Sequence, residues 1–177
     1  MTFVAFLRGI NVGGHHKLPM AALREQLTEM GFENVQTLLN SGNVVFESSE
    51  TDIQALESNM ERQLAQAFNF PVPVIVRTKE ELTTLVTENP FESFTIHKDL
   101  RLYVTFLKEA PSIELTLPYF SKDGAFQIIS MTDRMIFSVL DLSISNTTKG
   151  MDELEKLVGK KCTTRNWNTV VKLVNCD

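Results

Sequence analysis

The chain has 177 residues, of which 43% are apolar, and a formal net charge of −5. This length suits one domain or two small subdomains with enough apolar residues for a core, and the net acidity argues against a general nucleic-acid coat protein. Two cysteines are too few for a disulfide framework, no basic region precedes the N-terminal apolar run, and no apolar stretch reaches the roughly 20 residues that span a bilayer. We therefore expect a soluble cytoplasmic protein without a membrane partner.

The first 78 residues alternate between strand and helix patterns. Apolar runs indicate strands, and apolar residues at helical spacing indicate amphipathic helices. Pro19 suits a first helical turn, Gly42 suits the positive φ of a hairpin turn, and Pro73 suits an edge strand because it cannot donate to a sheet ladder. The predicted elements, in the order βαββαβ, cover residues 2–8, 19–30, 35–39, 43–47, 52–68 and 73–77. This order is the ferredoxin-like pattern, which predicts one antiparallel sheet with both helices on one face.

The second half of the chain shows weaker patterns. Capping boxes are predicted at 51–54, before the second helix, and at 78–81, before a third helix that runs to about Val86. Further expected elements are strands at 101–107, 125–131 and 135–140, a loop at 142–150 and a helix at 151–158. The helical spacing of Trp167, Val170, Val171 and Val174 predicts a closing amphipathic helix with Trp167 in the core.

These patterns together predict an α+β fold with two subdomains. Residues 1–78 are expected to form the ferredoxin-like βαββαβ half. Residues 79–177 are expected to form a smaller α+β subdomain that ends in the closing helix.

Three segments stand out by their sequence: Leu7–Gly14 reads LRGINVGG, Ser41–Phe46 reads SGNVVF, and Thr163–Val170 reads TTRNWNTV. In this order they resemble the opening, second and closing signatures of the bacterial domain-of-unknown-function family 1697. The resemblance spans nearly the whole chain. It implies a ferredoxin-like first half with an appended α+β second half, and it implies no activity, catalytic residue or cofactor.

The first of these segments is a glycine-rich loop at a predicted strand-to-helix junction, where free backbone N–H groups can point at an anion. Gly9 and Gly14 have the spacing of a phosphate-binding P-loop, but His15 and His16 stand where that motif needs Lys and then Ser or Thr. The P-loop interpretation therefore fails, and a tight connection that needs glycine for its backbone is the alternative to a ligand site. The candidate ligand-binding residues of this loop are Arg8, Gly9, Asn11, Gly13, Gly14 and Lys17.

Two further segments offer polar groups. In the hairpin turn, Ser41 and Asn43 are candidates, although such residues more often only make the turn. Before the closing helix, Thr163 or Thr164 is expected to cap the helix, with Arg165 and Asn166 beside free amides at the positive end of its dipole; a capped helix without a ligand is the alternative. The candidates from this segment are Thr164, Arg165, Asn166 and Asn168.

The loop and the closing segment are expected to converge, with Arg8 and Arg165 facing one cleft that takes a phosphate or carboxylate. The leading hypothesis is therefore a protein that binds a phosphorylated or other anionic small molecule. The sequence does not decide whether the protein is an enzyme, and it names no catalytic residue and no cofactor.

Two alternatives involve other partners. Residues 156–172 carry five basic residues and no acidic one, which suits a nucleic-acid-associated module, although the overall acidity weighs against it. An interaction module could pair its edge strand with another copy, and Pro73 weighs against that pairing. His15 and His16 have no nearby cysteine or carboxylate that would complete a metal site. Cys162 lies near Lys160, Lys161 and Arg165, which could lower its pKa, but a buried or bystander thiol is the simpler interpretation.

Overall fold

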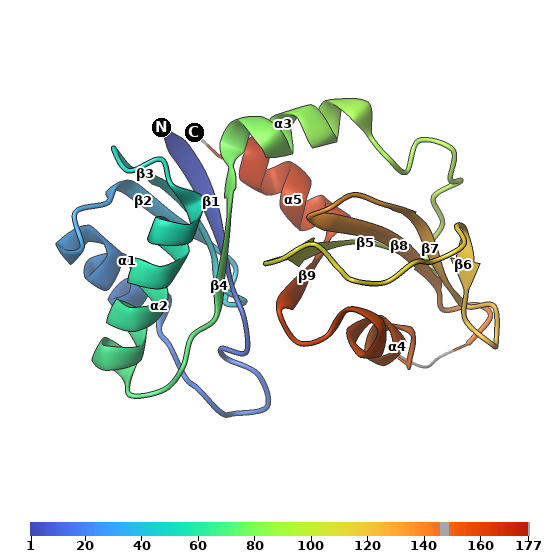
Figure 1. The fold of residues 1–177 in the computed structure, drawn as a ribbon, viewed down its shortest axis with the longest axis horizontal. Helices are drawn as coiled ribbons and strands as arrows, with labels where there is room; N and C mark the ends of the chain where they lie inside the picture. The colour runs from blue at the N-terminus through green and yellow to red at the C-terminus, as the bar shows by residue number, and fades with distance from the viewer. Residues whose placement is uncertain (146–148, 177) are drawn as a thin grey trace. The chain divides into compact units, whose positions relative to one another are not determined.

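The computed structural model describes residues 1–145 and 149–176, and the chain divides into two compact units (Figure 1). The first unit comprises Met1–Thr84 and Lys172–Asp177, and the second comprises Leu85–Val171. The boundaries fall inside two helices, α3 (Lys79–Glu88) and α5 (Trp167–Val174). Two antiparallel sheets and their helices confirm the α+β class. The division after residue 78 stays a prediction.

The first unit is built on a four-stranded antiparallel sheet in the order β2-β3-β1-β4. Its six predicted elements are confirmed, with ends that differ from the prediction by two residues or fewer. They are β1 (Thr2–Leu7), α1 (Met20–Glu29), β2 (Glu33–Leu38), β3 (Asn43–Glu47), α2 (Ile53–Phe68) and β4 (Val74–Thr78).

None of the described helices is both long enough and apolar enough to span a bilayer.

The core of the first unit lies between this sheet and its two helices, which cover one face of the sheet (Figure 1). Alternate strand residues point toward the helices, as the period of two in a strand requires. These inward-facing strand residues are Phe3, Ala5, Leu7, Val44, Phe46, Val74 and Val76, and they meet Leu23, Leu27, Leu56, Met60 and Leu64 of the helices. Burial of each large aliphatic side chain contributes about 1.5–3 kcal/mol, so this contact stabilises the unit.

Two carboxylates of α2 complete the hydrogen bonds of the edge strand β4. The Val76 N–H donates to Oε1 of Glu57, and the Val74 N–H donates to Oε1 of Glu61, each at 2.9 Å. Residues two apart on a strand point their N–H groups to the same side of the strand. The Val74 and Val76 N–H groups are therefore the donors with which a further strand would pair at this edge. The two carboxylates therefore satisfy the donors at this edge of the sheet. The position of β4 at the edge agrees with the prediction from Pro73.

The two capping predictions have different outcomes. The Thr78 hydroxyl accepts from the Glu81 N–H at 3.1 Å, as predicted for the start of α3. At α2 the cap is Asp52, which accepts from the Gln54 and Ala55 N–H groups, and the predicted box that begins at Thr51 is wrong. An aspartate carboxylate is a stronger acceptor than a threonine hydroxyl, and here it is placed one residue closer to the helix.

The second unit contains a five-stranded sheet in the order β6-β7-β8-β5-β9. Its further elements are β5 (Leu100–Leu107), β6 (Tyr119–Phe120), β7 (Phe126–Met131), β8 (Met135–Asp141), α4 (Lys149–Val158) and β9 (Cys162–Asn166). The predicted hairpin of β7 and β8 is confirmed, whereas the short strand β6 lies in a region without a predicted element. Residues 146–148 of the predicted loop at 142–150 lie outside the described residues. The helix α4 begins at Lys149, so it includes the last two positions of that predicted loop.

The predicted helix start at Thr163 and Thr164 is wrong. Both residues belong to β9, which pairs antiparallel with β5, and α5 begins only at Trp167. Threonine is β-branched and favours extended backbone, and the pairing with β5 supplies the hydrogen bonds that a helix would otherwise supply. The group that accepts from the first turn of α5 is Oδ1 of Asn166, at 3.0 Å from the Asn168 N–H.

The buried side of α5 is also rotated from the predicted one. Trp167 is 8% exposed, which confirms its burial, and Val170 and Leu173 are buried with it. Val171 and Val174, which were expected on the buried stripe, are only half-buried.

Candidate functional site

The loop after β1, residues 8–18, is held in place largely by one side chain. Nδ2 of Asn11 donates to the carbonyl oxygens of Leu18 and Asn40, each at 2.9 Å, while Oδ1 accepts from the Leu18 N–H at 2.8 Å. Asn11 itself has a positive φ of 55°, which asparagine tolerates better than most residues. Its side chain therefore serves the loop and the neighbouring turn, and the predicted ligand contact would compete with these bonds.

The β2–β3 turn packs directly against this loop. The Leu7 N–H donates to the Gly42 carbonyl at 2.8 Å, and a Cβ at Gly42 would lie 2.7 Å from side-chain atoms of Leu7 and Ile10. Nδ2 of Asn43 donates to the Leu38 carbonyl and to the Ser41 hydroxyl. The structure thus brings the candidates of the first unit into one region, and uses Asn43 and Ser41 to build the turn.

The loop candidates that remain are mostly exposed. Gly9, Gly13, Gly14 and Lys17 are exposed, and Arg8 is half-buried. His16 stacks on Phe70 with ring centroids 4.6 Å apart, and its Nδ1 lies 3.2 Å from the Gly9 carbonyl oxygen.

The candidates on β9 have local partners. Nη1 of Arg165 donates to the Thr163 hydroxyl at 2.7 Å and to the Thr164 carbonyl at 2.9 Å, and the Thr164 hydroxyl lies 2.7 Å from that of Thr105. Burial lowers the pKa of Arg165 to about 10, so the guanidinium stays charged at neutral pH. Arg8 and Arg165 belong to different units, and their convergence on one anion stays a prediction.

The basic stretch at 156–172 is spread over several elements. Lys156 lies on α4, Arg165 on β9 and Lys172 on α5, and Lys172 belongs to the first unit. Nζ of Lys161 lies 2.7 Å from a carboxylate oxygen of Glu109 on the exposed surface. The proposal of a nucleic-acid surface on this stretch stays a prediction.

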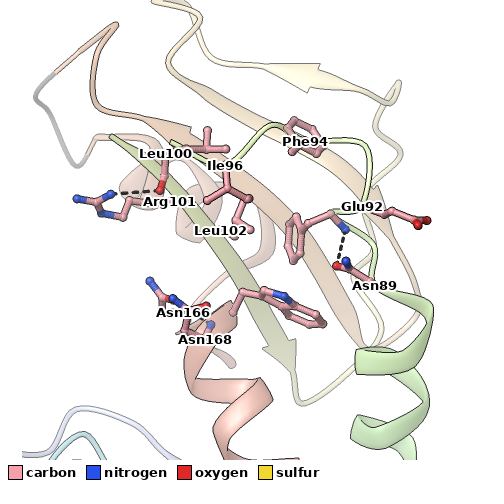
Figure 2. Close-up of a pocket in the computed structure, with 11 residues that line it drawn as sticks. Asn89, Glu92, Phe94, Ile96, Leu100, Arg101, Leu102, Asn166 and Asn168 are labelled. Carbon is pink, nitrogen blue, oxygen red and sulfur yellow. Dashed lines mark hydrogen bonds between the residues drawn. The ribbon is translucent and has the colours of Figure 1, made fainter. Parts of the chain in front are cut away.

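The second unit contains a pocket of about 530 Å³ beside the start of α5 (Figure 2). Its walls come from the segment between α3 and β5, from the start of β5 and from the junction of β9 with α5. The lining residues are Asn89, Phe91, Glu92, Phe94, Ile96, Leu100, Arg101, Leu102, Asn166, Trp167 and Asn168. Asn166 and Asn168 were predicted as ligand-binding residues, and the other lining residues were not.

The strand register explains how these segments meet. Tyr103 of β5 is the partner of Asn166 on β9, so Arg101, two residues earlier on β5, lies toward the start of α5. The Trp167 ring packs edge-on against Phe91 with centroids 5.2 Å apart, and this contact holds the segment after α3 against α5. The pocket therefore has a floor of strand residues and an aromatic wall.

Hydrogen bonds determine which polar atoms the pocket presents. The Phe91 N–H lies 3.3 Å from Oδ1 of Asn89, and the Asn168 N–H lies 3.0 Å from Oδ1 of Asn166. A backbone N–H pairs only with the oxygen of a carboxamide, so each Nδ2 is left with two donor hydrogens. Among the described residues, neither Nδ2 has a hydrogen-bond partner.

The two charged lining residues lie at opposite ends of the pocket. Figure 2 shows Arg101 and Asn166 at one end, Asn89 and Glu92 at the other, and Leu102 between them. Nη1 of Arg101 donates to the Lys98 carbonyl at 2.6 Å and to the Leu100 carbonyl at 3.1 Å, which orients the guanidinium. The Glu92 carboxylate and the Arg101 guanidinium both point away from Leu102 in the same view.

The segment that forms one wall had no signal in the sequence beyond Asn89-Pro90, which predicted only the end of α3. Asn89 has a positive φ of 41°, and this backbone places its carboxamide beside Phe91. Among the described residues, no group of three or more His, Cys, Asp or Glu side chains could hold a metal ion. Cys162 is buried, with Sγ 3.3 Å from the Gly159 carbonyl oxygen.

Comparison with known proteins places the chain in a family. Residues 1–137 match the family described as "Protein of unknown function (DUF1697)", which includes the first two resembling segments and stops before the third. The solved structure of the conserved bacterial protein SP0830 from Streptococcus pneumoniae is similar, with a TM-score of 0.73 and 24% identity over 98% of this chain and 97% of that chain. At this identity the likeness shows the fold alone, and no curated protein matches the chain. The chain belongs to the DUF1697 family.

Proposed function

We propose that this protein binds a small anionic molecule in the pocket of its second unit. The observation that carries the proposal is the set of hydrogen-bond donors described above. Asn89 and Asn166 each use their carboxamide oxygen on the backbone, and the amino group of each has no partner among the described residues beside the pocket. Such a pocket suits acceptor atoms, because donors without acceptors lose hydrogen bonds when a ligand displaces water.

The charge at the pocket supports an anion. Arg101 is the one cation among the described residues that line it, and its guanidinium keeps Nε and Nη2 available after Nη1 has bonded to the backbone. A guanidinium binds carboxylate and phosphate oxygens with charge-assisted hydrogen bonds. The volume of about 530 Å³ lies within the range of pockets for small molecules.

Binding suits the pocket better than catalysis. The lining residues include no histidine, cysteine, serine or lysine, so among the described side chains that line the pocket Glu92 is the one candidate for general acid–base chemistry. An enzyme would need a second group to act with it.

We also propose that the first unit has a ferredoxin-like fold. Its support is the element order βαββαβ, the antiparallel strand order β2-β3-β1-β4 and the position of both helices on one face. Such folds carry many functions, so this proposal adds nothing about the ligand.

A panel of anions measured by thermal shift and by fluorescence tests the binding proposal. Trp167 lines the pocket and is the only tryptophan of the chain, so its emission reports occupancy there. The panel is inorganic phosphate, glucose 6-phosphate, AMP, acetate and phenylacetate. A ligand at 100 times its dissociation constant that binds only the folded state should stabilise by about 2.7 kcal/mol.

The expected result is at least one anion that raises Tm and changes Trp167 emission, with both effects lost in Arg101→Ala and Asn166→Ala. Arg62→Ala is the matched control, because Arg62 is an exposed arginine of α2 in the other unit. Absence of binding by the whole panel, or binding that survives both pocket substitutions, would overturn the proposal.

A further inference from the structure

We infer that the ligand is an amphipathic monoanion, an apolar or aromatic body that carries a single carboxylate. This inference rests on the proposed function and names the ligand class for the same pocket. Four features of the lining carry it: the charge count, the donor beside Arg101, the position of the apolar side chains and the donor at the far end.

The charge count limits the ligand to one negative group. Arg101 is the only described lining cation, and the Glu92 carboxylate stands at the opposite end (Figure 2). A nucleoside diphosphate or triphosphate would bring several charges, and the described lining residues hold no second cation to meet them. One carboxylate matches one guanidinium, which can bind both of its oxygens.

The neighbouring donor improves the fit to a carboxylate. Asn166 lies at the same end of the pocket as Arg101, and its Oδ1 is held by the Asn168 N–H. Its Nδ2 can therefore donate to a carboxylate oxygen without giving up a bond that the chain already makes. Since the Asn168 bond fixes the carboxamide and the backbone carbonyls fix Arg101, both donors are oriented before a ligand arrives.

Solvent-exposed apolar side chains around the pocket indicate that the body of the ligand is apolar. Ile96 is 65% exposed, and Phe94, Leu100 and Leu102 are half-buried. Trp167 adds a ring that is almost covered by protein and still borders the pocket. A sugar or a bare inorganic anion would leave these apolar surfaces in water, whereas a flat or branched apolar body would cover them.

The far end of the pocket adds a preference for an acceptor. Nδ2 of Asn89 lies there with no partner among the described residues, and Phe94 and Glu92 lie on the same segment. A hydroxyl or carbonyl oxygen on the body of the ligand would bond to Nδ2 of Asn89. The inferred ligand is thus acidic at the Arg101 end and carries an oxygen atom at the Asn89 end.

Matched probes measure separately how the carboxylate head and the apolar body of the ligand contribute to affinity. Calorimetry and Trp167 emission are measured with phenylacetate, with acetate as the head alone, with 2-phenylethanol as the body without the charge, and with ADP as a multiply charged ligand. We expect phenylacetate to bind at least about tenfold more tightly than each of the others, which corresponds to about 1.4 kcal/mol.

Two variants assign the effect to residues. Arg101→Leu keeps the bulk and removes the charge, so it should weaken phenylacetate by about tenfold or more and leave 2-phenylethanol unchanged. Ile96→Ser changes an exposed side chain, so the fold should persist, and it should weaken phenylacetate while leaving acetate unchanged. Arg62→Leu is the control for the loss of an arginine outside the pocket.

The outcomes distinguish the two proposals. If acetate or phosphate binds as tightly as phenylacetate and Arg101→Leu abolishes binding, the pocket takes anions and the inferred class is wrong. Tightest binding by ADP, or equal binding of phenylacetate and 2-phenylethanol, also overturns the class. If no anion binds at all, the proposed function itself fails.

Discussion

The loop after β1 and the pocket of the second unit use asparagine in similar local settings, yet they differ in how much of each side chain the protein needs for itself. Asn11 has a positive φ and spends both ends of its carboxamide on Leu18 and Asn40. Asn89 also has a positive φ, but it spends only its oxygen, on the Phe91 N–H. The first arrangement builds a loop, and the second leaves the amino group of the side chain without a partner among the described residues.

Residue type and turn position therefore do not identify a binding residue. Asparagine favours turns because its side chain bonds to nearby backbone, and that local bonding consumes the atoms that a ligand would need. The loop and the pocket differ in how many hydrogen-bonding atoms each asparagine side chain leaves unused. Substitutions at the two places should therefore affect different properties, stability at the loop and binding at the pocket.

Trp167→Ala tests this comparison with the largest effect, since Trp167 belongs to both the core and the pocket. The substitution removes a ring that is 8% exposed and packs on Phe91, and should lower the free energy of unfolding by about 3–5 kcal/mol. Urea denaturation followed by circular dichroism measures it. A loss under about 0.5 kcal/mol, less than a buried aromatic allows, together with lost ligand binding, would show that the ring serves the ligand only.

Gly42→Ala should be the most damaging change in the region of the loop after β1. A Cβ there would lie 2.7 Å from atoms of Leu7 and Ile10, on a backbone with φ of 77°. We expect a loss of about 3 kcal/mol from overpacking and left-handed strain, with ligand binding by the folded protein unchanged. Gly124→Ala is the control, because Gly124 has a similar φ of 73° and open space around it. Equal losses in the two variants would contradict the close approach.

Asn11→Ala and Asn166→Ala compare the two uses of asparagine directly. Asn11→Ala removes the bonds to Leu18 and Asn40 and should cost about 2–3 kcal/mol of stability without loss of binding. Asn166→Ala removes one bond to the first turn of α5 and should cost only about 1 kcal/mol while abolishing binding. Thermal unfolding and Trp167 emission measure the two properties. Asn34→Ala, at a φ of 50°, controls for the backbone conformation of Asn11. If the same variant lost more of both stability and binding, the proposed difference between the two asparagines would be wrong.

The smallest effect is expected at Asp141, a polar residue of the second unit that is used locally as Asn11 is. Hydrogen bonds from the Ser143 hydroxyl and N–H, and the nearby His97, lower the pKa of Asp141 in the folded protein. Its stabilisation is therefore present above the unfolded pKa of about 3.9 and is lost as pH falls below that value.

Asp141→Asn should accordingly reduce the dependence of Tm on pH in the acidic range, and leave ligand binding at neutral pH unchanged. Thermal unfolding of both proteins at a series of pH values checks the prediction. A variant whose Tm falls with acidity as steeply as that of the parent protein would show that Asp141 does not contribute.

Local sequence patterns were sufficient for the elements of the first unit. The apolar runs of β1 and β3 arise because nearly all of their side chains are buried, and the helical spacing in α1 and α2 arises because each helix buries one face in the core. Pro73 and Gly42 added the edge and the turn, because both residues act through their own backbone. Such signals are contained in a few neighbouring residues, so they can be read without knowledge of the fold.

Elements and sites that depend on distant partners follow only from the folded chain. Thr163 and Thr164 suit a helix cap or a strand equally, and pairing with β5, about 60 residues earlier, made them a strand. The pocket needs Asn89, Arg101 and Asn166 together, and no local pattern links them. Hydrogen bonds and register across the sheet determine which atoms remain for a ligand, so the candidate site became visible only in the folded chain.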